Sequence, residues 1–414
     1  MKKSTILTDL FLDCAFLCYN FDMENNLQPL GAHLVQQFED IFSHIAYPET
    51  IVVVSTAPAP RTALGEVFGE RGNAQGKIVA FLKSTGVDYV FDTTFGADLT
   101  TICEARELLE RLENPAQLPL LNSCCPTFVK FIENFYPQLK SNLSTTLTPI
   151  ANMGAYIKHV FAHEIKVSAK NIYHIALTPC VAKKLEIKKQ NYTLKHCENT
   201  TFAVPHTPLS QSALATLKAI RKNYGIDPAA PFNVLQSSQT PTYLTDAVIT
   251  TNELATLIKL SGKNYADIAP RECDEICGNA IQFGHSGGVV KSVIECAYFL
   301  LNNALPPENF VNFEKQNPFL YVANIELGKH KIKIAKIDGL KNWEQFVSEN
   351  NLRDYAFIEV MMCAGGCLGG TGQPKPADLD ARKAILLQSQ KHNSAQNAYA
   401  NQLINDFPNL FINE

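Results

Sequence analysis

The sequence predicts an α/β fold, because short β-branched runs alternate with segments of helical periodicity along most of the chain. Ile51–Ser55 is a continuous run of this kind, as expected of a strand buried in a parallel sheet. A helical pattern follows over Gly76–Thr85, and Val87–Phe91 is typical of a second strand. Strands separated by helices in this way favour mostly parallel sheets. The 414 residues are enough for two lobes of ordinary domain size or for one large unit.

The rest of the chain continues the same alternation. Leu118–Leu121 is a short apolar strand candidate that runs straight into a cysteine pair, and Leu99–Leu112 carries leucines at helical spacing. Further strands are expected at Ile172–Leu177, Ala247–Thr250 and Phe357–Met361, and further helices at Thr251–Leu260, Gly288–Leu301 and, as a polar tail, Asp378–Phe407. We therefore divide the chain into an N-terminal extension at 1–47, a two-lobed core at 48–376 and a helical C-terminal tail at 377–414.

Composition and charge exclude several classes of protein. The chain is 46% hydrophobic and 18% charged, which is normal for a soluble globular enzyme. A net charge of -4 gives no basic excess for nucleic-acid binding. No apolar run reaches the roughly 18 to 20 residues of a membrane-spanning helix. Asp9 and Asp13 interrupt the apolar N-terminal stretch, so we expect no secretory signal.

Twelve cysteines are many for a chain of this kind. A disulfide framework belongs mainly to small secreted domains, so metal ligation in a reducing compartment is the better interpretation. We expect a cytoplasmic protein or, in a eukaryote, one of an anaerobic organelle.

Five of the cysteines share one feature, which is that each closely follows an apolar strand candidate. Ligands in open α/β sheets collect at the carboxyl ends of strands, so three distant segments are expected to meet at one site. Four thiolates from such loops would satisfy one cubane iron–sulfur cluster. The five cysteines are Cys124 and Cys125 after Leu118–Leu121, Cys180 after Ile172–Leu177, and Cys363 and Cys367 after Phe357–Met361.

The third cysteine segment is the most informative. Cys363–Gly372 contains five glycines in ten residues. Glycine permits positive φ and lets the backbone approach a bulky inorganic cofactor closely. Backbone N–H groups that no side chain covers can also donate hydrogen bonds to cluster sulfur. A glycine-rich turn with two incidental cysteines would have the same spacing, but the full string favours a cofactor loop.

Together the three segments resemble the signature motifs of the iron-only ([FeFe]) hydrogenases. The first motif usually contains Thr-Ser-Cys-Cys-Pro and corresponds here to Asn122–Phe128; the second, from Met-Pro-Cys to Lys and Glu, corresponds to Thr178–Glu186; the third corresponds to Glu359–Pro374. The stretches Thr56–Arg61 and Phe283–Val289 also match. The resemblance covers about residues 50 to 376. It implies two lobes, each with a mostly parallel sheet flanked by helices, and an active-site cofactor in the cleft between them.

The resemblance also implies a cofactor, the H-cluster, in which a [4Fe-4S] cluster is bridged to a two-iron subcluster with CO, CN and dithiolate ligands. Cys125, Cys180, Cys363 and Cys367 would hold the cubane, with Cys367 as the bridge. Cys124 would face the distal iron and carry the proton. Adjacent residues of an extended segment point to opposite sides, so neighbouring cysteines can serve different pockets. The alternative for Cys124 is a buried inert thiol.

Other positions correspond to the pocket around the two-iron subcluster. Lys183 matches a lysine that pairs with an iron-bound cyanide, and an ammonium suits such an anionic ligand. Backbone amides around Ala57 and Pro58 would enclose the open iron position, and Phe283 and Met361 would line the apolar wall. A surface lysine is the alternative for Lys183, and plain core filling is the alternative for Met361.

A proton route is implied as well. Glu104, Glu107, Arg111 and Ser144 fall where members of the family have a relay that ends at the cysteine. The three residues at 104, 107 and 111 share one helix face because they are three and four positions apart. A solvated, salt-bridged helix face would have the same pattern, and Ser144 would also fit an ordinary helix cap.

Several positions depart from the family pattern. Thr178 replaces a methionine, Ile150 stands where a glutamine often binds a cyanide, Phe128 replaces tryptophan and Thr371 interrupts the glycine run. These changes put turnover rate and direction in doubt more than the type of cofactor. The remaining cysteines are interpreted as ordinary thiols, and no accessory ferredoxin-like cluster is expected at the N-terminus; they are Cys14, Cys18, Cys103, Cys197, Cys273, Cys277 and Cys296.

The resulting hypothesis is a hydrogenase that interconverts protons, electrons and H2. Its implied partners are a ferredoxin-like electron carrier and the maturation proteins that build the two-iron part, with no nucleic acid or membrane. A hydrogen sensor of low activity and a non-enzymatic hydrogenase-like iron–sulfur assembly protein are the alternatives. Sensors in the family often lose the proton-carrying cysteine, which is present here. Assembly proteins typically carry an N-terminal four-cysteine cluster and a C-terminal tryptophan, whereas the single tryptophan here is Trp343.

Overall fold

The computed structural model describes residues 28–47, 49–189, 192, 211–223, 227–228, 243–274, 278–376, 378–388 and 393–413. Most of the expected N-terminal extension, with Cys14 and Cys18, lies outside the described residues, as do Cys197 and Cys277. The strands are β1 Ile51–Thr56, β2 Tyr89–Asp92, β3 Leu120–Leu121, β4 Ile172–Thr178, β5 Ala247–Thr250, β6 Glu314–Lys315, β7 Leu320–Leu327, β8 His330–Asp338 and β9 Phe357–Met361. The α-helices are α2 Gln28–Ala46, α3 Pro60–Ala63, α4 Gln75–Ser84, α5 Thr94–Glu113, α6 Pro126–Phe135, α7 Pro149–Ala155, α8 Ala162–Glu164, α9 Lys183–Glu186, α10 Gln211–Asn223, α11 Thr251–Leu260, α12 Gly288–Asn302, α13 Leu340–Glu349, α14 Leu379–Gln388 and α15 Ala398–Asp406.

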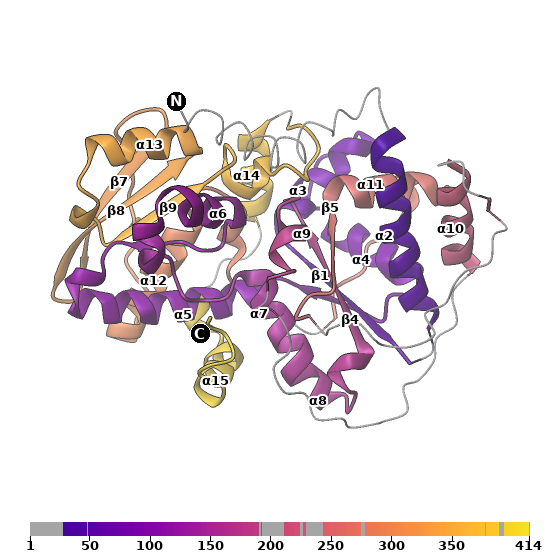
Figure 1. The fold of residues 1–414 in the computed structure, drawn as a ribbon, viewed down its shortest axis with the longest axis horizontal. Helices are drawn as coiled ribbons and strands as arrows, with labels where there is room; N and C mark the ends of the chain where they lie inside the picture. Colours follow the sequence, from indigo (N-terminus) through magenta and orange to yellow (C-terminus); the bar gives the residue numbers. More distant parts are fainter. Residues whose placement is uncertain are drawn as a thin grey trace.

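The first sheet is fully parallel, as the β-branched runs predict. Its strand order is β2-β1-β4-β5, and every residue of β1, β4 and β5 is buried. Val52 and Val54 of β1 pack in the core formed with α2, α4, α10 and α11, whereas Ile51 and Val53 pack in the core that includes α5 and α7. This sheet and its helices form one half of the molecule (Figure 1). The strands predicted in this half are confirmed to within two residues.

The second sheet is mixed, which corrects the expectation of a mostly parallel sheet in both lobes. Its order is β3-β9-β8-β7-β6; the pairs β3/β9 and β8/β9 are parallel, and β8/β7 and β7/β6 are antiparallel. Strands β7 and β8 form a hairpin whose two-residue turn begins with Gly328 at a φ of 59°. No strand is predicted here from β-branched runs, although Lys331–Ile334 alternates polar and apolar residues, which is the signal for a half-buried strand.

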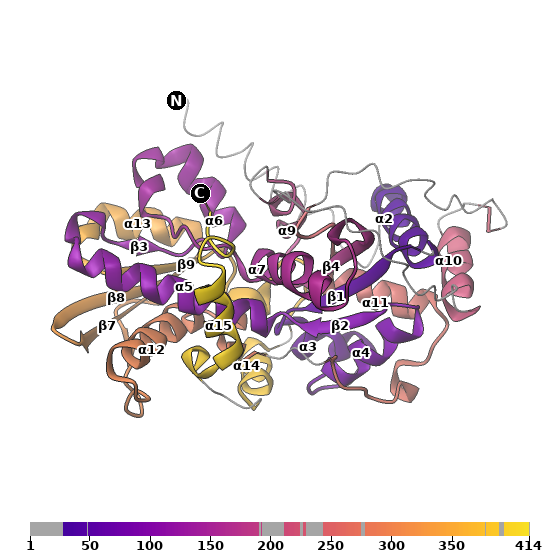
Figure 2. The same ribbon diagram turned by 90° about the horizontal axis from the view of Figure 1, so that it is seen from below.

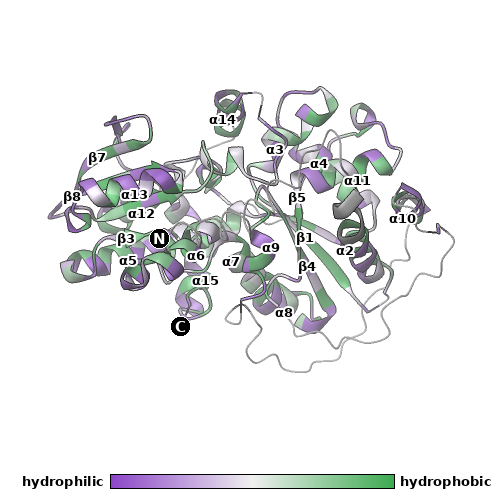
Figure 3. Cartoon of the chain, turned by 45° about the horizontal axis from the view of Figure 1, so that its top comes forward, coloured by the Kyte–Doolittle hydropathy of each residue, from purple (hydrophilic) through white to green (hydrophobic). Residues whose placement is uncertain are grey.

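One hydrophobic core joins the two halves of the molecule. It contains Val53 of the first sheet, Ile334 of the second, and Leu99 and Leu108 of α5 between them. The twenty-residue helix α5 packs against α7, α12 and α15, and Figure 2 shows α15 alongside it. Strands β1, β4 and β5 of the first sheet are predominantly hydrophobic, whereas the outer helices carry hydrophilic residues on their exposed sides (Figure 3). The two lobes therefore share one hydrophobic core.

None of the helices among the described residues is long and apolar enough to cross a membrane.

The expected helical tail consists of two helices that pack in different places. Helix α15 packs on α5, while α14 packs on the loop that contains Cys367. Arg382 of α14 is fully buried and donates to both carboxylate oxygens of Glu66, at 2.8 and 2.6 Å. It also donates to the carbonyl oxygens of Leu368 at 2.7 Å and Pro374 at 2.9 Å. This arginine therefore fixes the end of the third cysteine segment against the first lobe.

Candidate metal centre

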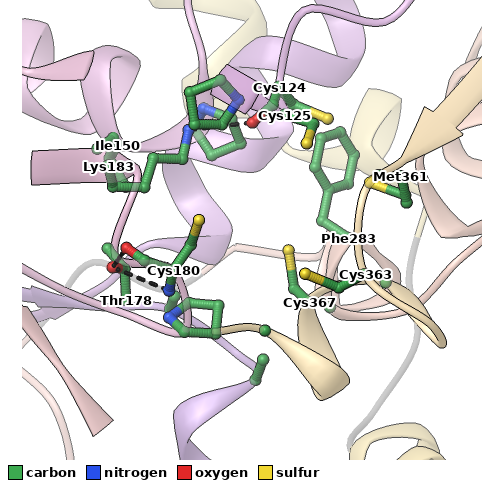
Figure 4. Close-up of a pocket in the computed structure, with 18 of the residues that line it drawn as sticks. Cys124, Cys125, Ile150, Thr178, Cys180, Lys183, Phe283, Met361, Cys363 and Cys367 are labelled. Atoms are coloured by element: carbon green, nitrogen blue, oxygen red, sulfur yellow. Dashed lines mark hydrogen bonds between the residues drawn. The ribbon is translucent and has the colours of Figure 1, made fainter. Parts of the chain in front are cut away.

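A cavity of about 300 Å³ lies where the loops that follow β1, β2, β3, β4 and β9 meet, and all five motif cysteines line it (Figure 4). In Figure 4, Cys180 faces Cys363 and Cys367 across the open space, and Cys124 and Cys125 lie on a third side. The predicted convergence of three distant segments is therefore confirmed. The other predicted residues on the walls are Ala57, Pro58, Ile150, Thr178, Lys183, Phe283, Met361 and Thr371.

The first cysteine pair is placed between β3 and α6. Cys125 is the residue before α6 and has an extended backbone, with φ -96° and ψ 102°, and Pro126 begins the helix. Proline suits the first helical position because its missing N–H would have no partner there. An extended backbone directs neighbouring side chains to different sides, so Cys124 and Cys125 can face different parts of the cavity.

Cys180 follows β4 in a turn that Thr178 stabilises. The Thr178 hydroxyl donates to the carbonyl oxygen of Cys180 at 3.1 Å and accepts from its N–H at 3.4 Å. The residue that departs from the family pattern therefore binds the backbone of a predicted ligand. Thr371, the second such threonine, accepts from the N–H of Val181 at 3.3 Å.

The glycines of the third segment are needed for contact between loops. Gly365 and Gly366 have φ values of 71° and 72°, a region that other residues rarely adopt. A Cβ on Gly366 would lie 2.5 Å from the nitrogen of Ser286, and one on Gly370 would lie 2.4 Å from the carbonyl oxygen of Pro179. The glycine-rich segment thus packs directly on the backbone of the second cysteine segment and of the Ser286 loop.

Gly366→Ala should therefore displace the loop between Cys363 and Cys367. Overpacking of this kind costs about 1–3 kcal/mol, in addition to the cost of the positive φ. The matched control is Gly262→Ala, because Gly262 has the same φ of 72° but nothing within 4 Å of its Cβ position. We expect only Gly366→Ala to lower iron and sulfide content after cluster reconstitution. Equal thermal destabilisation and equal iron content in both variants would contradict the contact argument.

The electrostatics of the thiols show that three of them lie close together. Burial raises the pKa of Cys125, and it raises the pKa values of Cys180 and Cys367 to about 12. The charge of Cys125 further raises the pKa of Cys180, and the charges of Cys180 and Cys125 further raise that of Cys367. Metal ligation requires thiolates, so a positively charged cluster is what would make these sulfurs stable in ionised form.

The donor set fits a cubane cluster and not a single metal ion. In the part of the chain that the structure describes, no three His, Cys, Asp or Glu side chains lie close enough to share one ion, as a tetrahedral zinc site would require. A cubane has four irons that each need a thiolate, so its ligands surround a volume. Cys125, Cys180, Cys363 and Cys367 all lie on the walls of one cavity, which is this arrangement.

The predicted proton relay is hydrogen-bonded around Glu107 but not at Glu104. Glu107 accepts from Arg111 at 2.6 Å, from the Ser144 hydroxyl at 2.8 Å and from the N–H of Thr145 at 3.2 Å. Glu104 is fully buried, and neither of its carboxyl oxygens has a hydrogen-bond partner among the described residues. Its charge interacts with those of Glu107 and Cys124. A solvated helix face is therefore excluded for Glu104, and Ser144 caps no helix because Thr148 precedes α7.

A sequence profile described as "Iron only hydrogenase large subunit, C-terminal domain" matches residues 50–201 and 234–371, well over half of the chain. The chain belongs to the iron-only hydrogenase family. Iron hydrogenase 1 of Clostridium pasteurianum is 30% identical over 382 residues, covering 88% of this chain and 58% of the relative. The NADP-reducing hydrogenase subunit HndD of Solidesulfovibrio fructosivorans is 31% identical, covering 84% and 54%. The chain thus spans little more than half the length of these two relatives.

The family also contains proteins named for another role. The cytosolic Fe-S cluster assembly factor narfl of Danio rerio is 28% identical over 359 residues, covering 83% of this chain and 77% of the relative. A solved structure of apo [FeFe]-hydrogenase HydA1 from Chlamydomonas reinhardtii, in a variant form, has a TM-score of 0.69 at 25% identity and covers 90% of this chain and 94% of that one. Membership of the iron-only hydrogenase family therefore establishes the fold and supports iron–sulfur binding, while the activity needs a separate argument.

The expected role of Ala57 and Pro58 requires a correction. Both residues line the cavity, but neither has an N–H that is available to a group bound there. The N–H of Ala57 donates to the carbonyl oxygen of Leu177 at 2.9 Å, and proline has no N–H. These residues can therefore contribute only their apolar surfaces and carbonyl groups, while buried Phe283 and Met361 line the cavity elsewhere.

Lys183 is the cationic residue expected in this pocket, and its ammonium is held by two partners. It donates to a carboxylate oxygen of Glu186 at 2.6 Å and to the carbonyl oxygen of Cys124 at 3.0 Å. Burial lowers the pKa of Lys183, but the charge and hydrogen bond of Glu186 raise it more, so the net direction is upward. The lysine therefore remains charged on the cavity wall, and a surface location is excluded.

Sequence reasoning missed two polar residues beside the site. Asn122 accepts from the N–H of Val360 at 2.7 Å, and its amide group donates to the carbonyl oxygen of Val360 at 3.3 Å and to the Cys124 sulfur at 3.4 Å. It thereby joins the end of β3 to β9. Glu186 fixes Lys183. The sequence signal for Asn122 is a polar residue directly after an apolar strand. The signal for Glu186 is a carboxylate three positions after Lys183, a spacing that allows an ion pair on a helix.

The pKa of Glu104 predicts a pH-dependent stability. Burial, and secondly the charge of Glu107, raises this pKa from 4.5 to about 8. The folded state therefore retains a proton that the unfolded chain releases, so the stabilisation is complete below pH 4.5 and is lost as the pH rises through 8. Glu104→Gln should match the wild type near pH 5 and unfold at a higher temperature at pH 9.

Thermal unfolding of the metal-free chain between pH 5 and 9 tests this expectation. The control is Glu110→Gln, which changes an exposed glutamate on the same helix. If the unfolding temperatures of the wild type and Glu104→Gln changed with pH in parallel, burial would not raise the pKa of Glu104 as stated.

Proposed function

We propose that this protein is an [FeFe]-hydrogenase that catalyses the reversible conversion of two protons and two electrons into H2. Its cofactor would be a [4Fe-4S] cluster held by Cys125, Cys180, Cys363 and Cys367, and bridged through Cys367 to a two-iron subcluster with CO, CN and dithiolate ligands. When bound, this group would supply the redox site at which protons and electrons combine. The chain's own side chains would hold the group, move the protons and exclude water.

The fifth cysteine carries the proposal. A cubane uses four thiolates, yet five cysteines line the cavity. A protein that only holds or transfers a cubane has no need for an additional thiol at the end of a buried carboxylate path. Cys124 interacts electrostatically with Glu104, and Glu107, Ser144 and Arg111 continue the path. Proton delivery to the cavity is the function that accounts for this combination.

The residues of the relay suit that role. The pKa of Glu104 is raised to about 8, so at neutral pH it is a buried neutral acid, and it would donate its proton toward the Cys124 sulfur after a side-chain movement that brings the two groups into contact. A pKa near the working pH favours general acid–base catalysis. Glu107 can return the proton to Glu104, since Arg111 and Ser144 hold its carboxylate in place.

Lys183 and the apolar wall would orient the two-iron subcluster. A charged ammonium on a mostly apolar wall favours an anionic ligand such as cyanide. Phe283, Met361, Ala57 and Pro58 would limit water around it. Ile150 lacks a hydrogen-bonding group where other members often have one, so Lys183 would carry more of the orienting role, consistent with altered or slow turnover.

The proposed partners follow from the chemistry. Electrons would come from a ferredoxin-like carrier that docks near the cubane, and the two-iron subcluster would be built by dedicated maturation proteins. H2 and protons are the proposed substrates. Neither nucleic acid nor membrane is part of the proposal.

Iron–sulfur assembly is the second candidate, because the assembly factor of Danio rerio matches nearly as much of the chain, 83%, as the two hydrogenases, 88% and 84%. Infrared spectroscopy of protein produced together with the maturation proteins separates the two. Metal-bound CO and CN give bands that no other protein group gives, and we expect them together with H2 turnover. Protein produced without maturation proteins is the control. A cubane without these bands, and without H2 turnover after maturation, would favour the assembly role.

A further inference from the structure

The chain between Leu143 and Leu147 is held from two sides. On the inner side, the N–H of Ser144 donates to the carbonyl oxygen of Leu121 at 2.8 Å. On the outer side, the segment Phe411–Asn413 runs antiparallel to it. The N–H of Leu147 donates to the carbonyl oxygen of Phe411 at 3.0 Å, and the N–H of Asn413 donates to that of Thr145 at 2.6 Å.

This held chain carries two of the groups that bind Glu107. They are the Ser144 hydroxyl, at 2.8 Å, and the N–H of Thr145, at 3.2 Å. The carbonyl oxygen of Thr145 accepts from the N–H of Asn413. Thr145 therefore binds Glu107 through its N–H and the segment Phe411–Asn413 through its carbonyl oxygen. A shift at Asn413 is therefore transmitted to the partner groups of Glu107 through a single residue.

The same part of the chain also contacts the helix that carries the relay. Arg106 of α5 donates to the side-chain oxygen of Asn405 in α15 at 2.9 Å. Phe411 is fully buried in the core that contains α5. Anchored by Phe411, the segment Phe411–Asn413 has a fixed position relative to both α5 and Leu143–Leu147.

We infer that Phe411–Asn413 is a positioning strap for the proton relay: it holds Ser144 and Thr145 on Glu107 and so sets the rate at which protons reach Cys124. The inference rests on the proposed function for its kinetic part. Its structural part concerns the amides of residues 144–147 and can be tested without any metal.

Asn413→Pro is the test variant, and Asn413→Ala is its matched control. Proline removes the N–H that binds Thr145, whereas alanine keeps this N–H and removes only the side chain. The β-bridge between Ile412 and Thr146 indicates an extended residue before position 413, which suits a following proline. The substitution leaves Phe411 in the core, so the fold should persist.

The first measurement is hydrogen–deuterium exchange of the metal-free chain. Asn413→Pro should accelerate exchange in the peptide that contains residues 144–147 by about fivefold, the effect of losing one hydrogen bond of about 1 kcal/mol, and Asn413→Ala should not. Unchanged exchange in Asn413→Pro would overturn the strap itself, whatever the protein's activity.

The second measurement uses matured protein with full iron content. Asn413→Pro should lower H2 turnover severalfold and raise the solvent isotope effect, with the infrared bands unchanged. In a Glu107→Gln background the same substitution should have no further effect, because the residue that the strap positions no longer takes part. An equal loss in both backgrounds would show general destabilisation and overturn the inference. If wild-type protein shows no turnover, the proposed function fails, while the exchange result still decides the strap.

Discussion

Cys125→Ala should abolish cluster binding and, with it, all H2 turnover. Three thiolates would remain for the four irons of a cubane, in a cavity where burial already disfavours the ionised sulfurs of Cys180 and Cys367. Loss of residues that merely support a metal ligand lowers metal affinity about 10- to 100-fold, so loss of a ligand should cost at least as much. The proposed two-iron subcluster should be lost too, because it would be attached through the cubane.

Iron and sulfide per chain, measured after reconstitution, provide the test. Cys296→Ala is the control, since Cys296 is a fully buried thiol that does not line the cavity. The control should retain normal iron content. If Cys125→Ala kept a stable cubane, another side chain would have to replace the thiolate, and the assignment of four ligands would be wrong.

Cys124→Ala should have the second largest effect, and of a different kind. It removes the thiol proposed to transfer protons but leaves all four cubane ligands in place. A positioned acid–base group contributes about 10² to 10⁴-fold to rate, so turnover should fall by that factor. Iron content and the CO and CN infrared bands should remain normal, because Cys124 is not among the four proposed ligands.

Turnover and iron content must be measured on the same preparations of matured Cys124→Ala. Cys103→Ala is the control for loss of a buried thiol, because Cys103 lies on α5 directly before Glu104 and does not line the cavity. Full activity in Cys124→Ala would mean that protons reach the cavity by another path. A parallel loss of iron and activity would make Cys124 a ligand instead of a proton carrier.

The parts of the fold that could be predicted are those in which local pattern and tertiary role agree. The buried strands β1 and β5 are short β-branched runs, and β9 is apolar except for Glu359, so their positions follow from the sequence to within a residue. The convergence of Cys125 with Cys367 also follows, because each comes after a strand of the same sheet, β3 or β9, and these parallel strands have their carboxyl ends at one edge. Cys180 follows β4 of the other sheet, so its place in the same cavity depends on how the two sheets pack together.

The parts that could not be predicted depend on partners far away in the chain. The direction of pairing between β7 and β8 is set by a two-residue turn at Gly328, which a search for β-branched runs overlooks. The use of the Ala57 N–H by Leu177 follows from the register of β1 and β4. The burial of Glu104 likewise depends on the elements packed around α5, and helix periodicity alone does not report it.

The pairing of β3 with β9 also fixes when the metal site can exist during synthesis. Asn122 binds Val360, which is 238 positions later in the chain, and β3 has no other strand neighbour in its sheet. At about 5–20 residues per second, roughly 10 to 50 seconds separate the translation of the two partners. Cys124, Cys125 and Cys180 leave the ribosome before Cys363 and Cys367 are made. If these cysteines hold the proposed cluster, their thiols must stay reduced and free of adventitious metal throughout that interval, and the complete cluster can be inserted only after Cys367 has been translated.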